Sequence, residues 1–373
     1  MNQSKGTIGF YIGNMNRSGG TERVLAQITS ELIQRNWKIC ILNMYGNSKE
    51  ESFYPFSPKI KKIWLMENYP STPKEHLQEI RNLHACLKRE HLRVLIELDL
   101  ILSIYTMPAR IGCGVKIIAW EHFNFYYQYR KHNRLHRIGM WLASWNAQKL
   151  VVLTKEDAKY YKKHFPWVRK KICQIYNPNS YQVTEEEIPE WKERKKVVMA
   201  AGRLTPAKGF SHLIESWRMI EREFPEWELV IAGEGELHEQ LEQQVHKQEL
   251  QHIKFLGNVK QEEMKELYKT VSVFAFPSIW EGFGLVLTEA MNYGLPCVAF
   301  ACKAGPKDIL EAEQGGFLVT TGDEESFANR LRQLMRDPLL CETMGKHAKD
   351  SCRRFDPGKI ADIWETLLRE FYR

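Results

Sequence analysis

Two glutamates eight residues apart, Glu281 and Glu289, flank a Gly-Phe-Gly segment in the second half of the chain. The apolar run 271–276 predicts a buried strand, and residues 285–293 predict a helix that ends before a Gly-x-Pro. In a parallel α/β sheet, ligands bind at the carboxyl ends of the strands, where helices present their N-termini. Glu281 is therefore predicted to lie in a ligand crevice, and Glu289 to reach the same ligand. An isolated pair of acids is also typical of a solvated loop and helix surface.

A second candidate site segment follows the predicted strand 197–201. It places Arg203 and Lys208 on a loop bounded by glycines, before a helix predicted over 210–224. Two cations at a strand-to-helix turn can bracket a diphosphate, because a guanidinium binds as a fork and an ammonium as a point charge. The loop lacks the Walker A pattern. The next predicted strand runs into Gly233 in a Gly-Glu-Gly-Glu segment.

The first half opens with a strand predicted over 8–12, a Gly-rich turn that contains Gly19 and Gly20, and a helix predicted over 21–35. Such a turn directs free backbone amides at a phosphate or a sugar hydroxyl, although Gly-Gly before a helix is also an ordinary tight turn. The turn is not the G-x-G-x-x-G fingerprint, which argues against a nicotinamide cofactor.

Further polar residues follow two more predicted strands of the first half. Asp99 comes after the strand 94–98, and Glu121 and His122 come after the strand 116–120. Histidine titrates near neutrality and can orient a substrate, so this strand end is a candidate site. The alternative is a hydrogen-bonded structural histidine.

Residues 122–155 contain no acid and interleave aromatic residues such as Tyr126 with cations such as Arg130. Aromatic residues beside cations suit the headgroups of an anionic membrane. They would equally suit single-stranded nucleic acid. A third interpretation is an amphipathic helix whose aromatic side belongs to the core.

The elements that position these residues alternate between strand and helix, which predicts parallel sheets covered by helices. A chain of 373 residues favours two domains. We expect a first domain over 1–178, a linker over 179–196, a second domain over 197–355, and a last helix over 356–373 that lies across the domain junction. The Ser-, Pro- and Lys-rich stretch 46–74 is expected to loop out.

Charge and composition narrow the class of protein. Residues 1–196 carry 32 Lys and Arg against 18 Asp and Glu, while residues 197–350 carry 16 against 24. A basic first half suggests an anionic partner. The sequence has no apolar run of membrane-spanning length and no recognisable signal peptide. Its eight cysteines form no C-x-x-C pair, which suits reduced thiols in the cytosol and gives no metal-site spacing.

Taken in order, the motifs resemble those of the retaining glycosyltransferases of family 4. The resemblance rests on Gly-Arg-Leu followed by Lys-Gly at 202–209, Ala-Gly-Glu-Gly at 232–235, Phe-Leu-Gly-Asn-Val at 255–259, and Pro-Ser-x-x-Glu-Gly-Phe-Gly at 277–284. It is strongest over 197–319 and weaker in the first half. It implies a GT-B fold, in which two Rossmann-like, doubly wound domains face each other across a cleft.

The resemblance also implies roles for individual residues. Arg203 and Lys208 would hold the donor diphosphate, Glu281 would contact the transferred sugar, and Glu289 would hold the ribose hydroxyls. Backbone groups of the sugar, phosphate and base subsites would come from Phe283, Gly284, Leu285, Gly233 and Val259. Gly19 and Gly20 would approach the diphosphate and His122 the sugar, while Asp99, Glu121, Tyr126 and Arg130 would lie on the acceptor side.

The resemblance predicts transfer of a hexose or N-acetylhexosamine, from a UDP-sugar in first place and GDP-mannose in second, to a glycan or lipid-linked saccharide. No metal and no cofactor are expected, since cations and helix N-termini can stabilise the leaving diphosphate. We expect a cytoplasmic enzyme, with peripheral contact to the inner face of an anionic membrane and no nucleic acid partner. The alternatives are a nucleotide-sugar epimerase on the same fold, or a basic nucleic-acid-binding protein.

Overall fold

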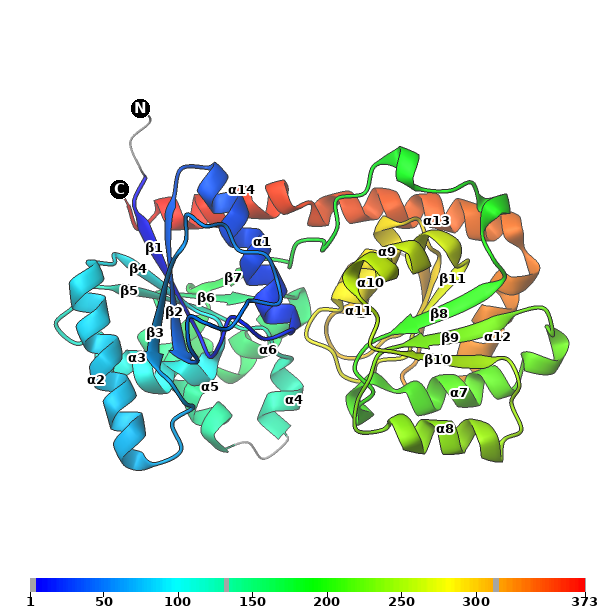
Figure 1. Cartoon of the computed structure of the whole chain (residues 1–373), viewed down its shortest axis with the longest axis horizontal. Coiled ribbons are helices and arrows are strands. Elements are labelled where there is room, and N and C mark those ends of the chain that lie inside the picture. Colours follow the sequence, from blue (N-terminus) through cyan, green and yellow to red (C-terminus); the bar gives the residue numbers. More distant parts are fainter. Residues whose placement is uncertain (1–4, 131–133, 311–314, 373) are drawn as a thin grey trace. The chain divides into compact units, whose positions relative to one another are not determined.

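The computed structural model describes residues 5–130, 134–310 and 315–372, and it divides into two compact units. The first unit comprises the chain up to Ser180 together with the segment from Pro357 onward, and the second comprises Tyr181–Asp356. Each unit is a parallel sheet with helices on its faces, seen in Figure 1. The predicted architecture of two doubly wound, Rossmann-like domains is confirmed.

The first unit contains a seven-stranded parallel sheet in the order β3-β2-β1-β4-β5-β6-β7. Its strands are β1 (Thr7–Ile12), β2 (Lys38–Tyr45), β3 (Lys61–Met66), β4 (Val94–Glu97), β5 (Lys116–Trp120), β6 (Lys149–Val152) and β7 (Ile172–Gln174). Its helices are α1 (Gly20–Gln34), α2 (Pro73–Glu90), η1 (Leu100–Leu102), α3 (Ser103–Ala109), α4 (Phe125–Arg130), α5 (Arg134–Asn146), α6 (Lys155–His164), η2 (Pro166–Val168) and α14 (Pro357–Arg369). The strand order reverses between β1 and β4, so the loops that follow these two strands flank the topological switch point.

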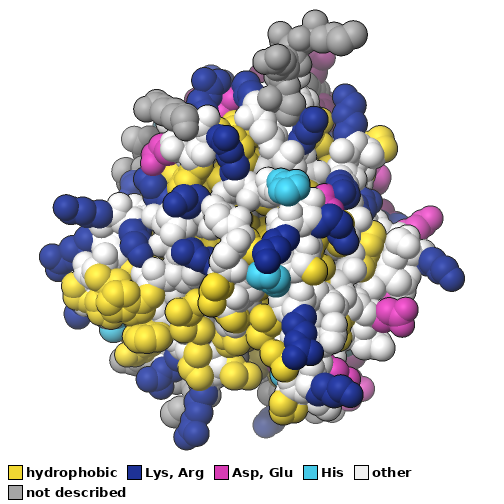
Figure 2. All heavy atoms as spheres, turned by 90° about the vertical axis from the view of Figure 1, so that its left-hand side faces the viewer, with side chains coloured by type: hydrophobic (Ala, Val, Ile, Leu, Met, Phe, Trp, Pro, Cys, Tyr) yellow, Lys and Arg dark blue, Asp and Glu magenta, His cyan; other side chains and the backbone are white. Residues whose placement is uncertain are grey.

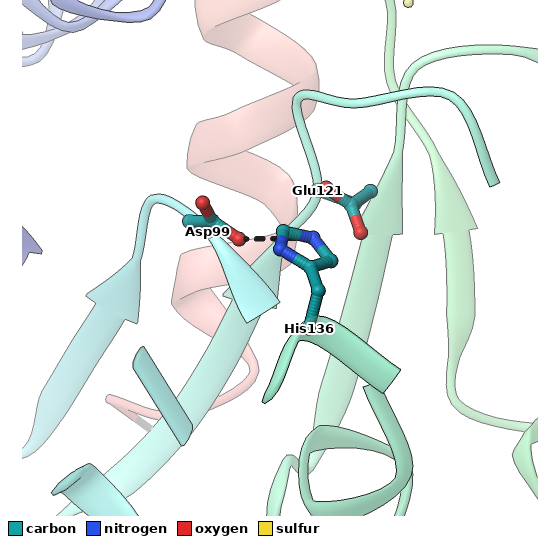
Figure 3. Close-up of side chains that lie close together, drawn as sticks. All are labelled: Asp99, Glu121 and His136. Atoms are coloured by element: carbon teal, nitrogen blue, oxygen red, sulfur yellow. Dashed lines mark ion pairs between the residues drawn. The ribbon is translucent and has the colours of Figure 1, made fainter. Parts of the chain in front are cut away.

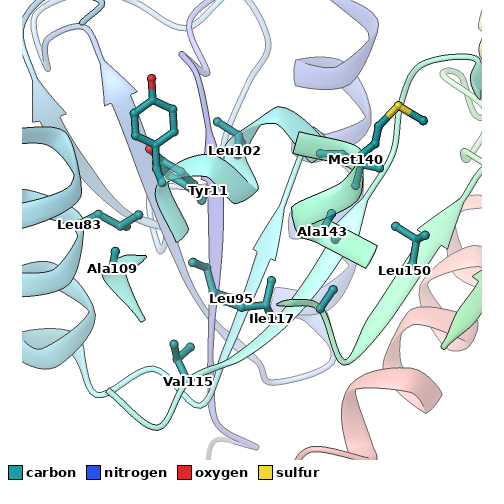
Figure 4. Packing of buried hydrophobic residues seen from close by; sticks show 14 of the residues in the cluster. Tyr11, Leu83, Leu95, Leu102, Ala109, Val115, Ile117, Met140, Ala143 and Leu150 are labelled. Atoms are coloured by element: carbon teal, nitrogen blue, oxygen red, sulfur yellow. The ribbon is translucent and has the colours of Figure 1, made fainter. Parts of the chain in front are cut away.

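The strands of this sheet are apolar on both faces because helices cover both. All four residues of β4 and five of the six in β1 are buried, as expected for a parallel sheet between two helical layers. Tyr11, Leu95, Ile117 and Leu150 pack with residues of α3 and α5 in one core cluster (Figure 4). The core therefore fixes the strand ends on which the site residues are placed.

One expectation for the first unit is wrong. The stretch 46–74, expected to loop out, contains β3 (Lys61–Met66), which pairs with β2 in register from Lys61 to Met66. This strand lies at the sheet edge and none of its residues is fully buried. Edge strands tolerate lysine and lack a continuous apolar run, so the sequence carries no clear strand signal there.

The second unit contains a six-stranded parallel sheet in the order β10-β9-β8-β11-β12-β13. Its strands are β8 (Val197–Ala201), β9 (Glu228–Ala232), β10 (Ile253–Gly257), β11 (Val273–Phe276), β12 (Cys297–Phe300) and β13 (Gly316–Val319). Its helices are η3 (Glu185–Glu187), η4 (Trp191–Glu193), η5 (Pro206–Lys208), α7 (Phe210–Arg218), η6 (Glu221–Glu223), α8 (His238–Lys247), α9 (Gln261–Thr270), α10 (Leu285–Asn292), α11 (Pro306–Ile309), α12 (Glu324–Arg336), α13 (Pro338–Cys352) and η8 (Arg353–Phe355). Here the strand order reverses between β8 and β11.

The segments expected to connect the domains each pack within one unit. In the segment 181–196, the buried guanidinium of Arg194 donates to the backbone carbonyls of Tyr268, Val271 and Tyr293 at 3.0, 2.9 and 2.6 Å. The helix α14 packs on α1, where Arg35 pairs with Asp362 at 2.9 Å. Residues 181–196 therefore belong to the second unit and α14 to the first.

A buried acid in the first core gives a prediction about stability. Glu79 of α2 is fully buried, accepts a hydrogen bond from Tyr11 Oη at 2.6 Å, and has its pKa raised by burial to about 7. Because the folded state holds this proton more tightly than the unfolded chain, stability should fall as pH rises from about 4.5 to about 7. Glu79→Gln should remove this loss and raise the free energy of unfolding at pH 8 by on the order of 3 kcal/mol.

Thermal unfolding between pH 5 and pH 8 measures the effect. Glu75, on the same helix, is the matched control. Hydrogen bonds from Ser71 and Thr72 lower its pKa to about 2, so its substitution should have the opposite effect on stability. Glu75→Gln should lower the unfolding temperature at pH 7. An unchanged pH dependence in Glu79→Gln would show that Glu79 is ionised at no cost in the folded protein.

Candidate functional site

The loops that follow β8 and β11 meet at the switch point of the second sheet and carry a cation and a carboxylate in contact. Lys208 Nζ lies 2.5 Å from Glu281 Oε2, and Ser278 Oγ donates to the same oxygen at 3.3 Å. The backbone amides of Ile279 and Trp280 both donate to the Ala207 carbonyl, at 3.0 and 3.1 Å. The two loops are therefore tied together by backbone bonds, and the ion pair is held between them.

Glycine makes this close approach possible. Gly209 adopts φ +66, and a Cβ there would collide with the carbonyl oxygen of Pro277 in the neighbouring loop. Gly284 adopts φ +109 and is the N-cap of α10. An L side chain is strained in both conformations, so glycine is the residue that fits these positions.

The charges at this switch point differ in exposure. The side chains of Lys208 and Glu281 are 24% and 14% exposed, so their attraction is only partly screened. Arg203 is exposed, and its guanidinium makes no hydrogen bond or ion pair within the described ranges. Lys208 is thus already paired with Glu281, whereas Arg203 is available to bind an incoming anion.

Glu289 has a different environment from the one expected for a ribose ligand open to solvent. It is 1% exposed, on the second turn of α10, and accepts a hydrogen bond from Tyr268 Oη at 3.0 Å. Tyr268 stacks on Tyr293 with ring centroids 5.5 Å apart. The structure therefore gives Glu289 a protein partner on its buried side.

The remaining predicted donor-side residues lie at the same edge of this sheet. Gly233 and Val259 are half-buried and follow β9 and β10, while Phe283 is buried and packs edge-on against Phe355 at 5.5 Å. Leu285 is the first residue of α10. The first four amides of a helix have no partner within the helix, which makes this end of α10 suited to an anion.

In the first unit, Gly19 is the N-cap of α1 and Gly20 its first residue, with extended backbone at the cap. Tyr54 Oη donates to the Ser18 carbonyl at 3.1 Å and so ties the Gly-rich turn to the loop after β2. This turn follows β1 and flanks the switch point of its sheet.

The other flank of that switch point carries a cluster of Asp99, Glu121 and His136. One potential ligand atom from each lies within 4.8 Å of the others, and His136 Nε2 is 3.4 Å from Asp99 Oδ1 (Figure 3). Across the described residues, no other group of three His, Cys, Asp or Glu side chains is close enough to hold a metal ion. The structure therefore brings the predicted Asp99 and Glu121 together.

Sequence reasoning missed His136. It lies on α5, whose buried residues include Met140 and Ala143, four and seven positions later. A histidine on the apolar face of a predicted helix was the available signal. A Cβ at Gly139 would lie 2.5 Å from Ile101 Cα, so a glycine lets α5 pack directly on η1 and bring His136 to Asp99.

Burial is the largest cause of the pKa shifts in this cluster. Desolvation raises the pKa of Asp99, opposed by His136, and raises the pKa of Glu121 well above its ordinary value. It lowers the pKa of His136, which Asp99 opposes. Glu121 accepts hydrogen bonds from the Phe123 amide at 3.0 Å and from Tyr161 Oη at 2.9 Å. Burial therefore favours the uncharged form of each of these three side chains.

His122 does not titrate near neutrality as expected, because burial lowers its pKa to about 3. Its ring packs on Trp120 with centroids 4.4 Å apart. Of the other acceptor-side candidates, Tyr126 is half-buried and packs edge-on against Tyr160 at 4.6 Å. The side chain of Arg130 lies outside the described residues.

The aromatic residues of 122–171 divide between core and surface. Phe125 is 1% exposed, whereas Trp141, Trp145 and Trp167 are 51%, 55% and 41% exposed. Trp145 stacks on Trp167 at 5.2 Å. Figure 2 shows hydrophobic side chains gathered on one face of the molecule, with lysines and arginines around them. Within the described ranges, no helix is both long enough and apolar enough to span a bilayer.

Comparison with known proteins matches both units to glycosyltransferase families. Residues 18–179 match the family described as Glycosyltransferase Family 4, and residues 182–351 match Glycosyl transferases group 1. An uncharacterized glycosyltransferase of Haemophilus influenzae is 29% identical over 97% of this chain and 99% of that protein.

A second relative has an assigned activity. It is the GalNAc-alpha-(1->4)-GalNAc-alpha-(1->3)-diNAcBac-PP-undecaprenol alpha-1,4-N-acetyl-D-galactosaminyltransferase of Campylobacter jejuni, 26% identical over 97% of this chain and 98% of its own length. Among solved structures, Anabaena HepE in complex with UDP and glucose superposes with a TM-score of 0.78, at 20% identity, over 97% of this chain and 99% of that one. The GT-B fold implied by the motifs is confirmed.

Proposed function

Because this chain belongs to the family-4 glycosyltransferases, we propose that it transfers a hexose or N-acetylhexosamine from a nucleoside-diphosphate sugar to a glycan or lipid-linked saccharide, with retention of the anomeric configuration. A UDP-sugar is the favoured donor and GDP-mannose the second candidate. The reaction would serve polysaccharide or lipopolysaccharide biosynthesis. The acceptor class is motivated by the Campylobacter relative, whose name specifies an undecaprenol-diphosphate saccharide.

The observation that carries this proposal is the Lys208–Glu281 pair at the switch point, with Arg203 beside it in sequence and exposed. A nucleotide sugar offers a diphosphate to the two cations and hydroxyl donors to the carboxylate. Binding would replace the bond between Lys208 and Glu281 with one bond from each to the donor. Charge-assisted hydrogen bonds of this kind are about twice as strong as neutral ones.

The leaving group is proposed to depart without a metal ion. As the bond between the anomeric carbon and the diphosphate breaks, negative charge grows on the diphosphate oxygen. Lys208 and the N-terminal amides of α10 are fixed donors for that charge, and preorganised donors stabilise a transition state without reorganisation. The exposed Arg203 would add a second cation. Glu289, bound by Tyr268, would hold the ribose hydroxyls.

Product analysis tests this function. The protein is incubated with UDP- and GDP-sugars and with lipid-diphosphate saccharide acceptors, with and without a chelator, and the anomeric configuration of the product is read by NMR. We expect transfer from a UDP-sugar, retention, and an unchanged rate in chelator. Conversion of the nucleotide sugar to its epimer without transfer would favour the epimerase, and thermal stabilisation by an oligonucleotide but by no nucleotide would favour a nucleic-acid-binding protein.

We also propose that the enzyme acts in the cytoplasm and contacts the inner face of an anionic membrane through the tryptophan surface, defined as Trp141, Trp145 and Trp167. These three rings are exposed next to a segment rich in lysine and arginine. Indole rings prefer the membrane interface, and each nearby Lys or Arg contributes about 1 kcal/mol on an anionic surface.

The double variant Trp141→Ala/Trp145→Ala should bind anionic vesicles at least about tenfold more weakly than the unaltered protein, because exposed apolar area is lost. Co-sedimentation with phosphatidylglycerol vesicles at low and high salt measures this. Leu339→Ala removes a side chain that is 72% exposed in the second unit and is the matched control. Equal partition onto neutral and anionic vesicles would contradict the proposal.

A further inference from the structure

The carboxylate of Glu289 has a partner inside the core of the second unit. Tyr268 lies fully buried on α9, and its hydroxyl donates to Glu289 Oε2 at 3.0 Å. Glu289 itself is only 1% exposed on α10. A hydrogen bond to a charged group is stronger than one between neutral groups, and its loss is costly when the charged group is buried. The contact with Tyr268 therefore fixes the orientation of this carboxylate.

Tyr268 is in turn held in place by two further contacts. Its ring stacks on the ring of Tyr293, with centroids 5.5 Å apart and planes inclined by 20°. The buried guanidinium of Arg194 donates to the backbone carbonyls of both tyrosines, at 3.0 Å to Tyr268 and 2.6 Å to Tyr293. Since Tyr268 belongs to α9 and Tyr293 follows α10, these contacts join the two helices. The contacts of the protein itself therefore fix the place of the Tyr268 hydroxyl.

We propose that Tyr268 is a positioning residue that orients the Glu289 carboxylate toward the ribose hydroxyls of the donor, and so makes donor binding depend on those hydroxyls. This inference rests on the proposed function, in which Glu289 holds the ribose. It goes further because it assigns the selectivity for ribose to a fully buried residue of a different helix, which acts through Glu289.

One carboxylate has the capacity for both Tyr268 and the ribose. An ionised carboxylate has two oxygens with about four lone-pair sites in total. It can therefore accept hydrogen bonds from the tyrosine and from two neighbouring ribose hydroxyls at once. A nucleotide without these hydroxyls would cover the carboxylate without supplying donors, and a site built to bind a hydroxyl strongly rejects a ligand that lacks it.

The hydrogen bond from Tyr268 matters because a glutamate side chain is flexible. Its rotatable bonds lose conformational entropy when the carboxylate is held in one orientation, and this loss opposes ligand binding. The fixed hydroxyl of Tyr268 restricts these bonds through the protein's own fold. The donor then binds a carboxylate that is already oriented, which strengthens its hydrogen bonds to the ribose.

Calorimetry with UDP and GDP tests the proposal, each nucleotide being compared with its dideoxy analogue, which lacks both ribose hydroxyls. In the unaltered protein, the analogue of the nucleotide that binds should bind at least about tenfold more weakly. Tyr268→Phe removes one oxygen and keeps the ring that stacks on Tyr293. It should weaken the ribonucleotide by about tenfold and change the binding of the analogue little, so the ratio of the two affinities should fall close to one.

Tyr293→Phe is the matched control, because it removes a hydroxyl from the other ring of the same stack. The hydrogen bond from Tyr268 to Glu289 persists in this variant, so the preference for the ribonucleotide should persist as well. If Tyr268 served only to support the fold, Tyr268→Phe would weaken the ribonucleotide and its analogue equally. An unchanged ratio of the two affinities would therefore overturn the proposal.

Steady-state kinetics with the nucleotide sugar give an independent measurement. Tyr268→Phe should raise the donor KM by about tenfold and leave kcat nearly unchanged, because the ribose is bound alike in the ground state and the transition state. A large fall in kcat at an unchanged KM would contradict a role in ribose binding.

A crystal structure of the unaltered protein with the bound nucleotide keeps the proposal testable if Tyr268→Phe folds poorly. Tyr268 Oη should donate to Glu289 while the ribose hydroxyls bind the same carboxylate. A Glu289 side chain turned away from Tyr268, or a ribose held by other residues, would overturn the assignment.

The two proposals fail in different ways. If the unaltered protein binds no nucleoside diphosphate and transfers from no nucleotide sugar, the proposed function is wrong, and the role of Tyr268 is wrong with it. If it transfers, prefers the ribonucleotide, and keeps that preference in Tyr268→Phe, only the role of Tyr268 is wrong.

Discussion

Glu281→Gln should lower kcat by about 100-fold or more and should tighten, not weaken, the binding of UDP alone. The carboxylate holds Lys208 at 2.5 Å, so UDP must separate the pair before its diphosphate can bind. A neutral amide of the same size releases the lysine. The transferred sugar loses its charged partner at the same time, and turnover falls.

Calorimetry with UDP and turnover with the UDP-sugar measure the two effects separately. Glu289→Gln is the matched variant. A hydrogen bond from a hydroxyl to a carboxylate contributes about 1.5–3 kcal/mol, so this variant should weaken the binding of UDP and of the UDP-sugar alike. Weaker UDP binding in Glu281→Gln together with unchanged binding in Glu289→Gln would reverse the two roles.

Arg203→Ala should lower kcat by about 100-fold and raise the donor KM, because a cation at the leaving group is lost. Arg203 is exposed and its guanidinium makes no hydrogen bond or ion pair among the described residues, so the unfolding temperature should stay the same. Lys208→Ala should also lower kcat. This substitution removes the cation that pairs with Glu281 as well, so its effect combines two losses.

Steady-state kinetics and thermal unfolding of both variants check this prediction. Arg222→Ala, at a surface arginine of η6 in the same unit, is the control and should behave like the unaltered protein. A loss of activity restored by magnesium or manganese would show that a metal, and not Arg203, stabilises the leaving diphosphate.

Strand-end residues were the part of the site that sequence could predict. In a parallel sheet, an apolar run followed closely by a charged residue predicts both the strand and the edge of the sheet at which the charge lies. Asp99, Glu121, Arg203 and Glu281 were placed on this argument, and the structure puts each at a carboxyl edge.

Residues whose setting depends on packing between helices were not predictable in this way. His136 reaches Asp99 because α5 packs on η1 at Gly139, a contact between segments with no sequence link. The burial of Glu289 against Tyr268 and the low pKa of His122 likewise follow from tertiary contacts. The edge strand β3 was not predicted because its residues are at most partly buried, and its sequence therefore lacks a continuous apolar run.

The bond between Lys208 and Glu281 has a consequence for competition in the cell. A ligand that supplies both an anion for the lysine and hydroxyl donors for the glutamate replaces both partners of the broken bond. Inorganic phosphate carries no sugar hydroxyls and a free sugar carries no anion, so each replaces only one partner of the pair. The enzyme should therefore bind phosphate and free sugars weakly, and bind the intact nucleotide sugar in preference to the products of its hydrolysis.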